Sequence, residues 1–309
     1  MALTQADIAR KIRTFQILRA GVTDAHGHLH APKGHFGGRF IAKLAGALGR
    51  DTKAASGPRP LPAPRSRGPA PGAGLRGTLT AAKTTREVSS AATAEARRIT
   101  GRDIPFDFTG SDPHVAREHA EGVLRGLERY PHARLRAVGL VDMSHEDEDG
   151  YRHTDWATTT VHTDGSASIN FDAGYSSPTG ASRYRESLAA AGERRRMGPG
   201  LTTSDPMGIA LHEFGHVLAG SGPTGVNGKA RQLADRVAVT HETYQHSDDP
   251  HVARAFRDLA IGHEVSVYAT EDKPELTAEA FADVMAHGDD ASVLSRLIAD
   301  LIDDEVTPS

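Results

Sequence analysis

Apolar and polar residues recur with different periods along the chain, and these periods predict where helices and strands lie. An apolar residue at every third or fourth position predicts helices over residues 4–20, 113–130, 206–219, 229–244, 250–261, 277–285 and 292–303. Asp112 and Asp205 each stand before a proline, which is typical of a helix cap followed by the first helical residue. The second half of the chain is therefore expected to be mainly helical.

Strands are predicted between these helices. Residues 135–143 form an apolar run typical of a buried strand, and residues 156–162 and 167–172 flank Asp164-Gly165, a good hairpin signal. The acidic residues 144–150 lack the spacing of an EF-hand and are expected to form a solvated loop. Together the pattern predicts an α+β domain with a small sheet that ends in a hairpin.

The N-terminal third has a different composition. Residues 54–77 are dominated by Pro, Gly, Ala and Arg, and they cannot bury enough apolar surface to offset the entropy of ordering. We therefore divide the chain into an N-terminal helix and Gly/His-rich segment (1–50), a mostly disordered linker (51–100) and a folded domain (101–309).

Charge is distributed as unevenly as composition. Residues 1–100 carry 17 Lys and Arg against 5 Asp and Glu, whereas the remainder carries 19 against 35, and the whole chain has a net charge of −4. A basic segment can bind an acidic partner or nucleic acid. Because the arginines of residues 50–76 lack interleaved aromatics, nucleic acid is disfavoured. A virion or delivery-apparatus partner is the expectation for residues 1–100.

Composition also limits cofactors and location. The chain has no cysteine, so disulfides and thiolate zinc sites are excluded. No apolar run approaches the length of a membrane span, and the N-terminus lacks a classical secretion signal. We expect a cytoplasmic or virion-associated protein, with delivery by a non-classical route as the alternative.

The residues that carry chemistry lie at His212-Glu213-Phe-Gly-His216, within one predicted helix. Residues four apart share one helix face, so His212 and His216 can present both imidazoles to a single cation. Glu213 then lies beside the cation and can take a proton from a bound water. This pattern predicts one catalytic Zn²⁺. The competing interpretation is two surface histidines on an ordinary amphipathic helix.

A catalytic zinc takes three protein ligands and leaves one position open. The residues three and six after His216 are Ala219 and Gly222, which excludes a third histidine at the metzincin position. We expect the ligand to come from the helix over 277–285, where Glu279 and Asp283 lie four apart on one face. Glu279 is the expected ligand, and Asp283 is expected to orient a histidine. Three further glutamates are candidates for the third ligand: Glu264, Glu271 and Glu275.

Three short blocks carry a family resemblance. They are the segment 212–216, Ser266-x-Tyr268-Ala269, and Glu279-Ala-Phe-Ala-Asp283. Their combination resembles the gluzincin peptidases typified by the catalytic domain of anthrax lethal factor, with relatives among phage proteins and bacterial toxins. The resemblance covers roughly residues 106–287 and is strong only in these blocks.

The resemblance implies a zincin-like fold. It also implies that His212, His216 and Glu279 bind zinc, that Glu213 is the general base, and that Tyr268 donates a hydrogen bond to the oxyanion. Two departures stand out: Asp283 replaces a residue that is often glutamate, and the segment between Tyr268 and Glu279 is longer than expected.

Taken together, the expected function is a zinc-dependent endopeptidase that acts on a protein or peptide substrate and is associated with phage or toxins. The alternative is a non-catalytic zinc-binding structural or virion-associated protein with a degenerate peptidase fold.

An Asp24-x-His26-x-His28 segment looks like the opening of an amidohydrolase site, but low-complexity sequence follows instead of barrel strands. Four further histidines are expected to be solvated or structural: His241, His246, His251 and His263.

Overall fold

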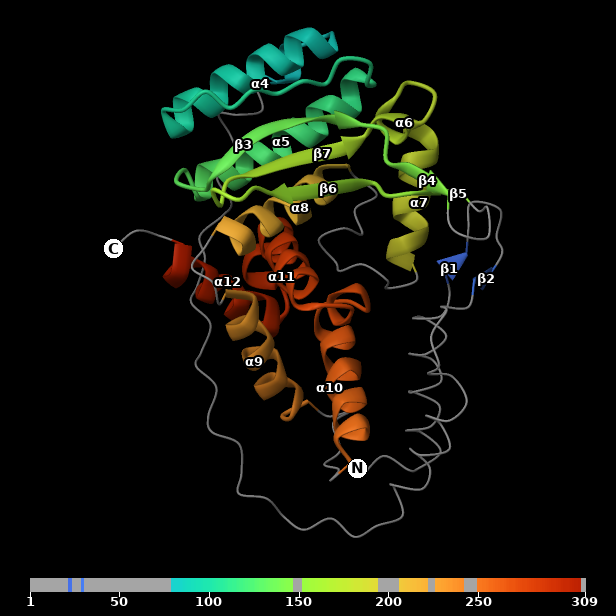
Figure 1. The fold of residues 1–309 in the computed structure, drawn as a ribbon, viewed down its shortest axis with the longest axis vertical. Coiled ribbons are helices and arrows are strands. Elements are labelled where there is room, and N and C mark those ends of the chain that lie inside the picture. The colour runs from blue at the N-terminus through green and yellow to red at the C-terminus, as the bar shows by residue number, and fades with distance from the viewer. Residues whose placement is uncertain are drawn as a thin grey trace.

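The fold of the chain is shown in Figure 1 as a computed structural model, which describes residues 22–23, 29–30, 79–146, 152–193, 206–221, 226–241 and 249–306. The predicted helix over 4–20, the predicted linker over 54–77, the histidines of the Asp24 segment, Asp205 and His246 lie outside the described residues. Among the helices within these ranges, none combines the length and the apolarity that crossing a membrane requires.

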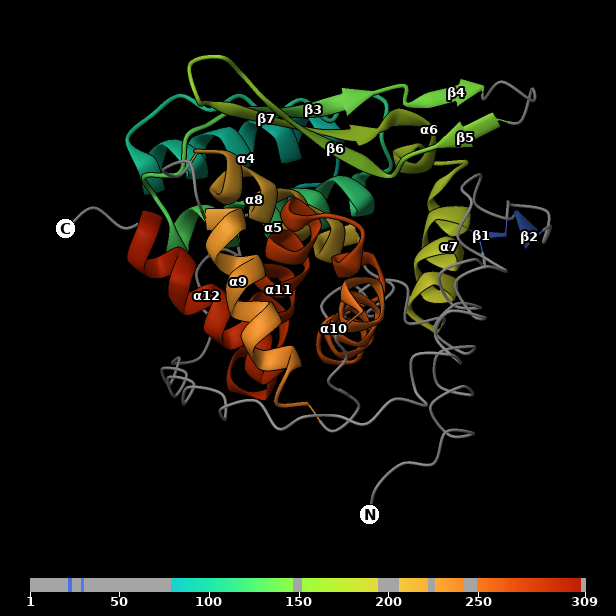
Figure 2. The ribbon, with the colours of Figure 1, turned by 60° about the horizontal axis from the view of Figure 1, so that its bottom comes forward.

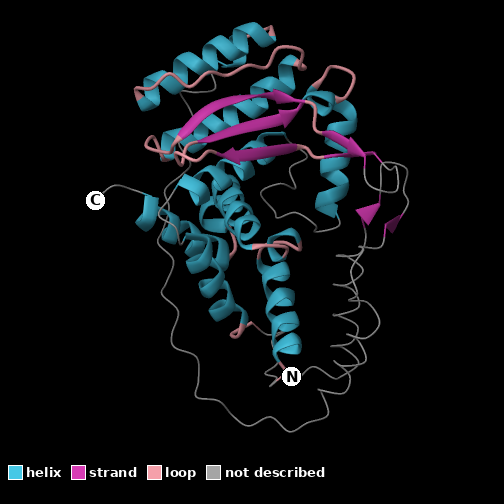
Figure 3. Cartoon of the chain, viewed as in Figure 1, coloured by secondary structure: helices cyan, strands magenta, loops and turns pink. Residues whose placement is uncertain are grey.

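The strands are β1 (Val22–Thr23), β2 (Leu29–His30), β3 (Leu135–Val141), β4 (Ser144–Glu146), β5 (Arg152–Thr154), β6 (Ala157–Val161) and β7 (Ala167–Asp172). The helices are α4 (Thr85–Thr100), α5 (Pro113–Arg129), α6 (Ala173–Ser176), α7 (Ala181–Glu193), α8 (Pro206–Ser221), α9 (Val226–Ala238), α10 (Pro250–Glu264), α11 (Lys273–His287) and α12 (Val293–Val306), with 3-10 turns η2 (Tyr268–Thr270) and η3 (Gly288–Asp290). The protein is thus mixed α+β and mostly helical, as Figure 3 shows.

A three-stranded sheet has the order β3-β7-β6. Strand β7 pairs parallel with β3 and antiparallel with β6, with Val161 opposite Ala167 where the hairpin closes. Gly165 in this turn has φ +76°, a left-handed conformation that glycine adopts without strain. The predicted hairpin is confirmed, and β6 forms one edge of the sheet.

The packed structure begins earlier than the expected boundary at residue 101. Helix α4 is capped by Thr84, whose side chain accepts a hydrogen bond from the backbone N–H of Glu87. Its residues Val88, Ala92 and Ala96 are fully buried in the core, and α4 lies along α5. A stripe of small residues therefore suffices to dock this helix, although its Ala/Thr-rich sequence carries only a weak apolar pattern.

Helix α8 lies at the centre of the fold. It packs on α5 and on strands β6 and β7 on one side, and on α11 on the other. Figures 1 and 2 show the sheet with α4 and α5 toward one end of the molecule and helices α9 to α12 gathered on the far side of α8. A residue on α8 can therefore face either the sheet edge or the helical half.

Two segments differ from the sequence-based expectation. The sequence predicts a solvated loop over 144–150, but residues 144–146 form β4, which pairs antiparallel with β5. Helix α11 begins at Lys273, one turn before the predicted start at Thr277, because Asp272 caps it and accepts a hydrogen bond from the N–H of Glu275 at 2.9 Å. The extra turn places Glu275 on the same helix as Glu279.

Candidate metal centre

Helix α8 presents both imidazoles of the sequence motif on one side, in consecutive turns. The Nε2 atoms of His212 and His216 lie 3.1 Å apart, and the two rings are nearly perpendicular, at 83°. The neighbouring apolar residues Leu211, Phe214 and Val217 are fully buried and hold the helix in the core. The helical spacing thus brings the two histidines together as the sequence predicts.

Gly215, between the two histidines, allows α11 to come close. A Cβ at this position would lie 2.7 Å from the Cα of Ala278, which is closer than any ordinary carbon contact. Glycine at 215 and alanine at 278 therefore let the two helix backbones approach. This approach carries the carboxylates of α11 to the imidazoles of α8.

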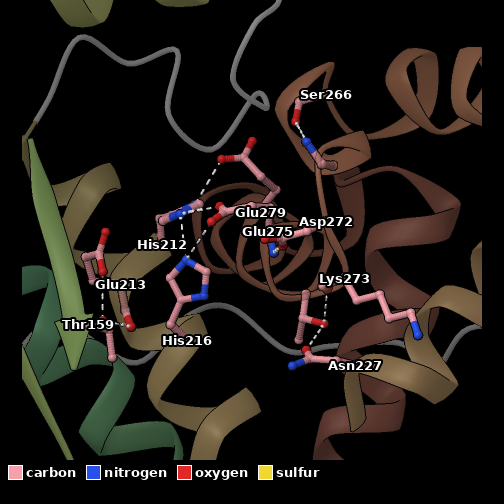
Figure 4. Close-up of polar contacts among 12 residues, drawn as sticks. Thr159, His212, Glu213, His216, Asn227, Ser266, Asp272, Lys273, Glu275 and Glu279 are labelled. Atoms are coloured by element: carbon pink, nitrogen blue, oxygen red, sulfur yellow. Dashed lines mark hydrogen bonds and ion pairs between the residues drawn. The ribbon is translucent and has the colours of Figure 1, made fainter. Parts of the chain in front are cut away.

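Two carboxylates of α11 contact the histidines, and they do so differently (Figure 4). Glu275 reaches the Nε2 atoms, with oxygens 3.1 Å from His212 and 3.5 Å from His216. Glu279 reaches the other nitrogen of His212, with Oε1 2.9 Å from Nδ1. The structure therefore brings Glu275, and not the expected Glu279, to the nitrogens that face each other.

The geometry of these groups suits a zinc ion. Ligand atoms around a tetrahedral zinc lie roughly 3.3 Å apart, because each bond is about 2.0–2.2 Å long. His212, His216 and Glu275 each offer one ligand atom, and these atoms all lie within 4.8 Å of one another. A carboxylate on the second nitrogen of a ligating histidine fixes its tautomer and orientation, which is the position of Glu279.

The electrostatics of the cluster are strongly coupled. Burial alone lowers the pKa of a histidine, but hydrogen bonds with Glu275 and Glu279 outweigh burial and raise the pKa of His212 to about 10. Burial raises the pKa of Glu275, but hydrogen bonds with His212 and His216 outweigh it and lower that pKa to about 2. The two carboxylates therefore favour positive charge between them and the imidazoles, whether a proton or a metal ion supplies it.

Glu213 lies on the side of α8 that faces the sheet edge. The hydroxyl of Thr159, in the middle of β6, donates to the carboxylate of Glu213 at 2.7 Å and lies 3.0 Å from the Glu213 carbonyl oxygen. Glu213 is buried, with 6% of its surface exposed. Its carboxylate thus lies against the edge strand, outside the contacts that join His212 and His216 to Glu275 and Glu279.

Tyr268 lies beside His212, in turn η2. Its ring centroid is 5.9 Å from that of His212. The turn is held by Ser266, whose hydroxyl accepts a hydrogen bond from the N–H of Ala269 at 3.0 Å. Burial and the nearby carboxylates, Glu275 first among them, raise the pKa of the Tyr268 hydroxyl, so it remains a hydrogen-bond donor at neutral pH.

Asp283 is bound at the C-terminal end of α11. Its carboxylate accepts from His287 at 2.9 Å and from the backbone N–H of Ser292 at 3.2 Å. It therefore joins the end of α11 to the start of α12. The sequence predicts that Asp283 orients a metal-binding histidine; in the structure its carboxylate contacts His287, whereas Glu279, one turn earlier, contacts Nδ1 of His212.

Two more glutamates are candidates for the third ligand on sequence grounds. Glu271 follows turn η2, and Glu264 lies beside His241, at 3.7 Å. Neither belongs to the group that His212 and His216 form with Glu275. The assignment of the third ligand therefore lies between Glu275 and Glu279.

Thr159 is a residue of the site that sequence reasoning misses. An alternating Thr-rich strand marks a sheet edge, but only tertiary packing reveals which hydroxyl meets Glu213.

Comparison with protein-family models, with curated proteins and with solved structures finds no match to this chain. The geometry of the site is therefore the basis for its function.

Proposed function

We propose that the protein is a zinc-dependent endopeptidase of zincin-like fold and gluzincin type. The observation that carries the proposal is the convergence of His212 Nε2, His216 Nε2 and the Glu275 carboxylate from two helices. Glu213 follows His212 in α8, and the ring of Tyr268 lies beside that of His212. We assign Glu275 as the third zinc ligand and Glu279 as the residue that orients His212. With Glu275 as ligand, the segment between Tyr268 and the third ligand is four residues, or about one helical turn, shorter than with Glu279.

A bound zinc ion would polarise the scissile carbonyl and make a water molecule more acidic. Glu213 would accept a proton from the water as its oxygen bonds to the carbonyl carbon, and would pass that proton to the amine nitrogen as the C–N bond breaks. The Tyr268 hydroxyl donates a hydrogen bond to the carbonyl oxygen as negative charge develops there. Thr159 holds the Glu213 carboxylate in place by donating to one of its oxygens.

Strand β6 is the proposed binding surface for the substrate. Within the described sheet it pairs only with β7, so its outer edge can accept an extended peptide as an added strand. Its central residue, Thr159, contacts the proposed base directly. A peptide aligned along β6 therefore runs past Glu213 and the histidines.

The test uses the full chain and its Glu213→Gln variant. We expect the wild type to bind one zinc ion at this site and to cleave an unfolded protein such as casein or a peptide library. Loss of the general base should reduce kcat/KM by about 10²–10⁴-fold while zinc stays bound. Full activity in the variant would contradict the role of Glu213, and zinc without cleavage in the wild type would favour a non-catalytic structural protein.

A further inference from the structure

A second group of metal-binding side chains lies outside the proposed catalytic site. His241 follows the end of α9, and His263 and Glu264 form the last turn of α10. One ligand atom from each of the three lies within 4.8 Å of the others. The ring centroids of His241 and His263 are 5.0 Å apart, and His241 Nε2 lies 3.7 Å from a Glu264 carboxylate oxygen.

We propose that His241, His263 and Glu264 form a second divalent-cation site, and that zinc is the ion it binds. Two imidazoles and one carboxylate are a ligand set that suits zinc, with a fourth position left for water. The 3.7 Å separation of His241 and Glu264 is too long for a hydrogen bond, but it is close to the spacing of two ligands that share one ion. The spacing of His241 and Glu264 therefore fits two ligands of one cation.

The burial of the three residues fits a site that closes around an ion. The side chains of His241 and Glu264 are 10% and 24% exposed, so packing holds both in position. His263 is exposed and can rotate to bring its ligand atom closer. Rotation of this side chain can bring its ligand atom toward the roughly 3.3 Å spacing expected around zinc.

The location of the site gives it a consequence for catalysis. A cation there would join the end of α9 to the end of α10. Glu264 stands only four residues before Tyr268, whose turn η2 flanks the proposed catalytic zinc. An occupied second site would therefore fix the start of the segment that positions Tyr268.

Zinc stoichiometry of the full chain tests this proposal. The protein is stripped with EDTA, reloaded with excess Zn²⁺, passed through gel filtration and analysed by inductively coupled plasma mass spectrometry. We expect two zinc ions per chain in the wild type and one in a variant with both His241→Asn and His263→Asn. His251→Asn, at an exposed histidine in the first turn of α10, is the matched control and should keep two.

The outcomes for the two sites can be told apart. If the catalytic site fails to bind but the second site exists, the wild type holds one ion and the double variant holds none. If the double variant holds as many ions as the wild type, the second site does not exist. His263→Asn alone removes an exposed side chain, so the fold is retained, and circular dichroism checks this. This variant should weaken binding of the second ion at least about 10-fold, and unchanged affinity would also overturn the proposal.

Discussion

Among the described residues, His119 and His212 are both buried in the core, in regions on opposite sides of α8, and they have opposite electrostatic character. His119 on α5 stacks on Phe171 of β7 with ring centroids 3.7 Å apart, and burial lowers its pKa to about 3. His212 on α8 is equally enclosed, but Glu275 and Glu279 raise its pKa to about 10. The difference shows that burial alone does not mark a functional histidine. The carboxylates brought by the neighbouring helix distinguish the histidine of the proposed metal centre from a packed one.

The largest effect is expected from removing the carboxylate of Glu275, which lies against the Nε2 atoms of His212 and His216. Glu275→Gln should abolish stoichiometric zinc binding and reduce kcat/KM by at least about 10³-fold, because a three-ligand site loses its only charged ligand. Glu279→Gln keeps an oxygen that accepts from His212 Nδ1, so it should weaken zinc binding only about 10–100-fold. Zinc titration of both variants decides the assignment. The reverse order would make Glu279 the ligand, as the sequence suggested.

His119, the histidine packed among apolar residues, predicts that the protein loses stability in acid. His119 has a pKa below its unfolded value of 6.5, so its contribution is fully present above pH 6.5 and is lost as pH falls toward 3. The slope for one proton is about 1.4 kcal/mol per pH unit. His119→Phe removes this group and should flatten the decline of unfolding free energy between pH 6 and 4. An unchanged slope would show that His119 does not titrate there.

His212 predicts the opposite pH dependence of stability, in protein that has been treated with a chelator to remove bound metal. The pKa of His212 is raised above its unfolded value, so its contribution is fully present below pH 6.5 and is lost as pH rises toward 10. We expect unfolding free energy to fall by up to about 1.4 kcal/mol per unit over this range. Urea unfolding at pH 7, 8 and 9 measures it, and saturating zinc should reduce the dependence.

The close approach of α8 and α11 can be tested by replacing glycines with alanine. Gly215→Ala places a methyl group against the backbone of Ala278 and should destabilise the protein by about 1–3 kcal/mol, because α11 must move away. Gly228→Ala, on α9, is the control: a Cβ there meets nothing within 4 Å, so the change should stabilise by about 0.5–1 kcal/mol. Equal effects in thermal unfolding would show that the helix contact is not tight.

The smallest effect is expected at the sheet edge. Thr159→Val keeps the shape of the side chain but removes the hydrogen bond to Glu213, and it should lower kcat about 10-fold. Thr159→Ser retains the hydroxyl and should stay near wild-type activity. Zinc content should be unchanged in both. A serine variant as impaired as the valine variant would show that packing, not the hydroxyl, matters at this position.

Local patterns predicted much of this architecture. Asp112 and Pro113 marked the start of α5, the Asp164-Gly165 turn marked the β6–β7 hairpin, and the spacing of His212 and His216 placed both imidazoles on one face. Each of these signals depends on residues adjacent in the chain or one helical turn apart. Such features can be predicted because local geometry determines them.

To predict the third ligand from the sequence, the start of α11 has to be placed correctly. Asp272 and Pro274 are a cap and an early proline, and together they indicate that the helix begins before Thr277. With that start, Glu275 and Glu279 become a pair four residues apart, like the two histidines. Which of the two meets Nε2 depends on the rotation and depth of α11 against α8. That is set by the contact of Gly215 with Ala278, a tertiary feature that no local pattern encodes.

The placement of α11 also determines when the proposed enzyme becomes competent during its synthesis. Glu275 follows His216 by 59 positions in the chain. At a translation rate of about 5–20 residues per second, the histidines leave the ribosome roughly 3–12 seconds before the carboxylate that completes their site. A nascent chain that has not yet released α11 therefore lacks both carboxylates of the proposed centre, and any activity of that centre has to wait until residues 275 and 279 have emerged.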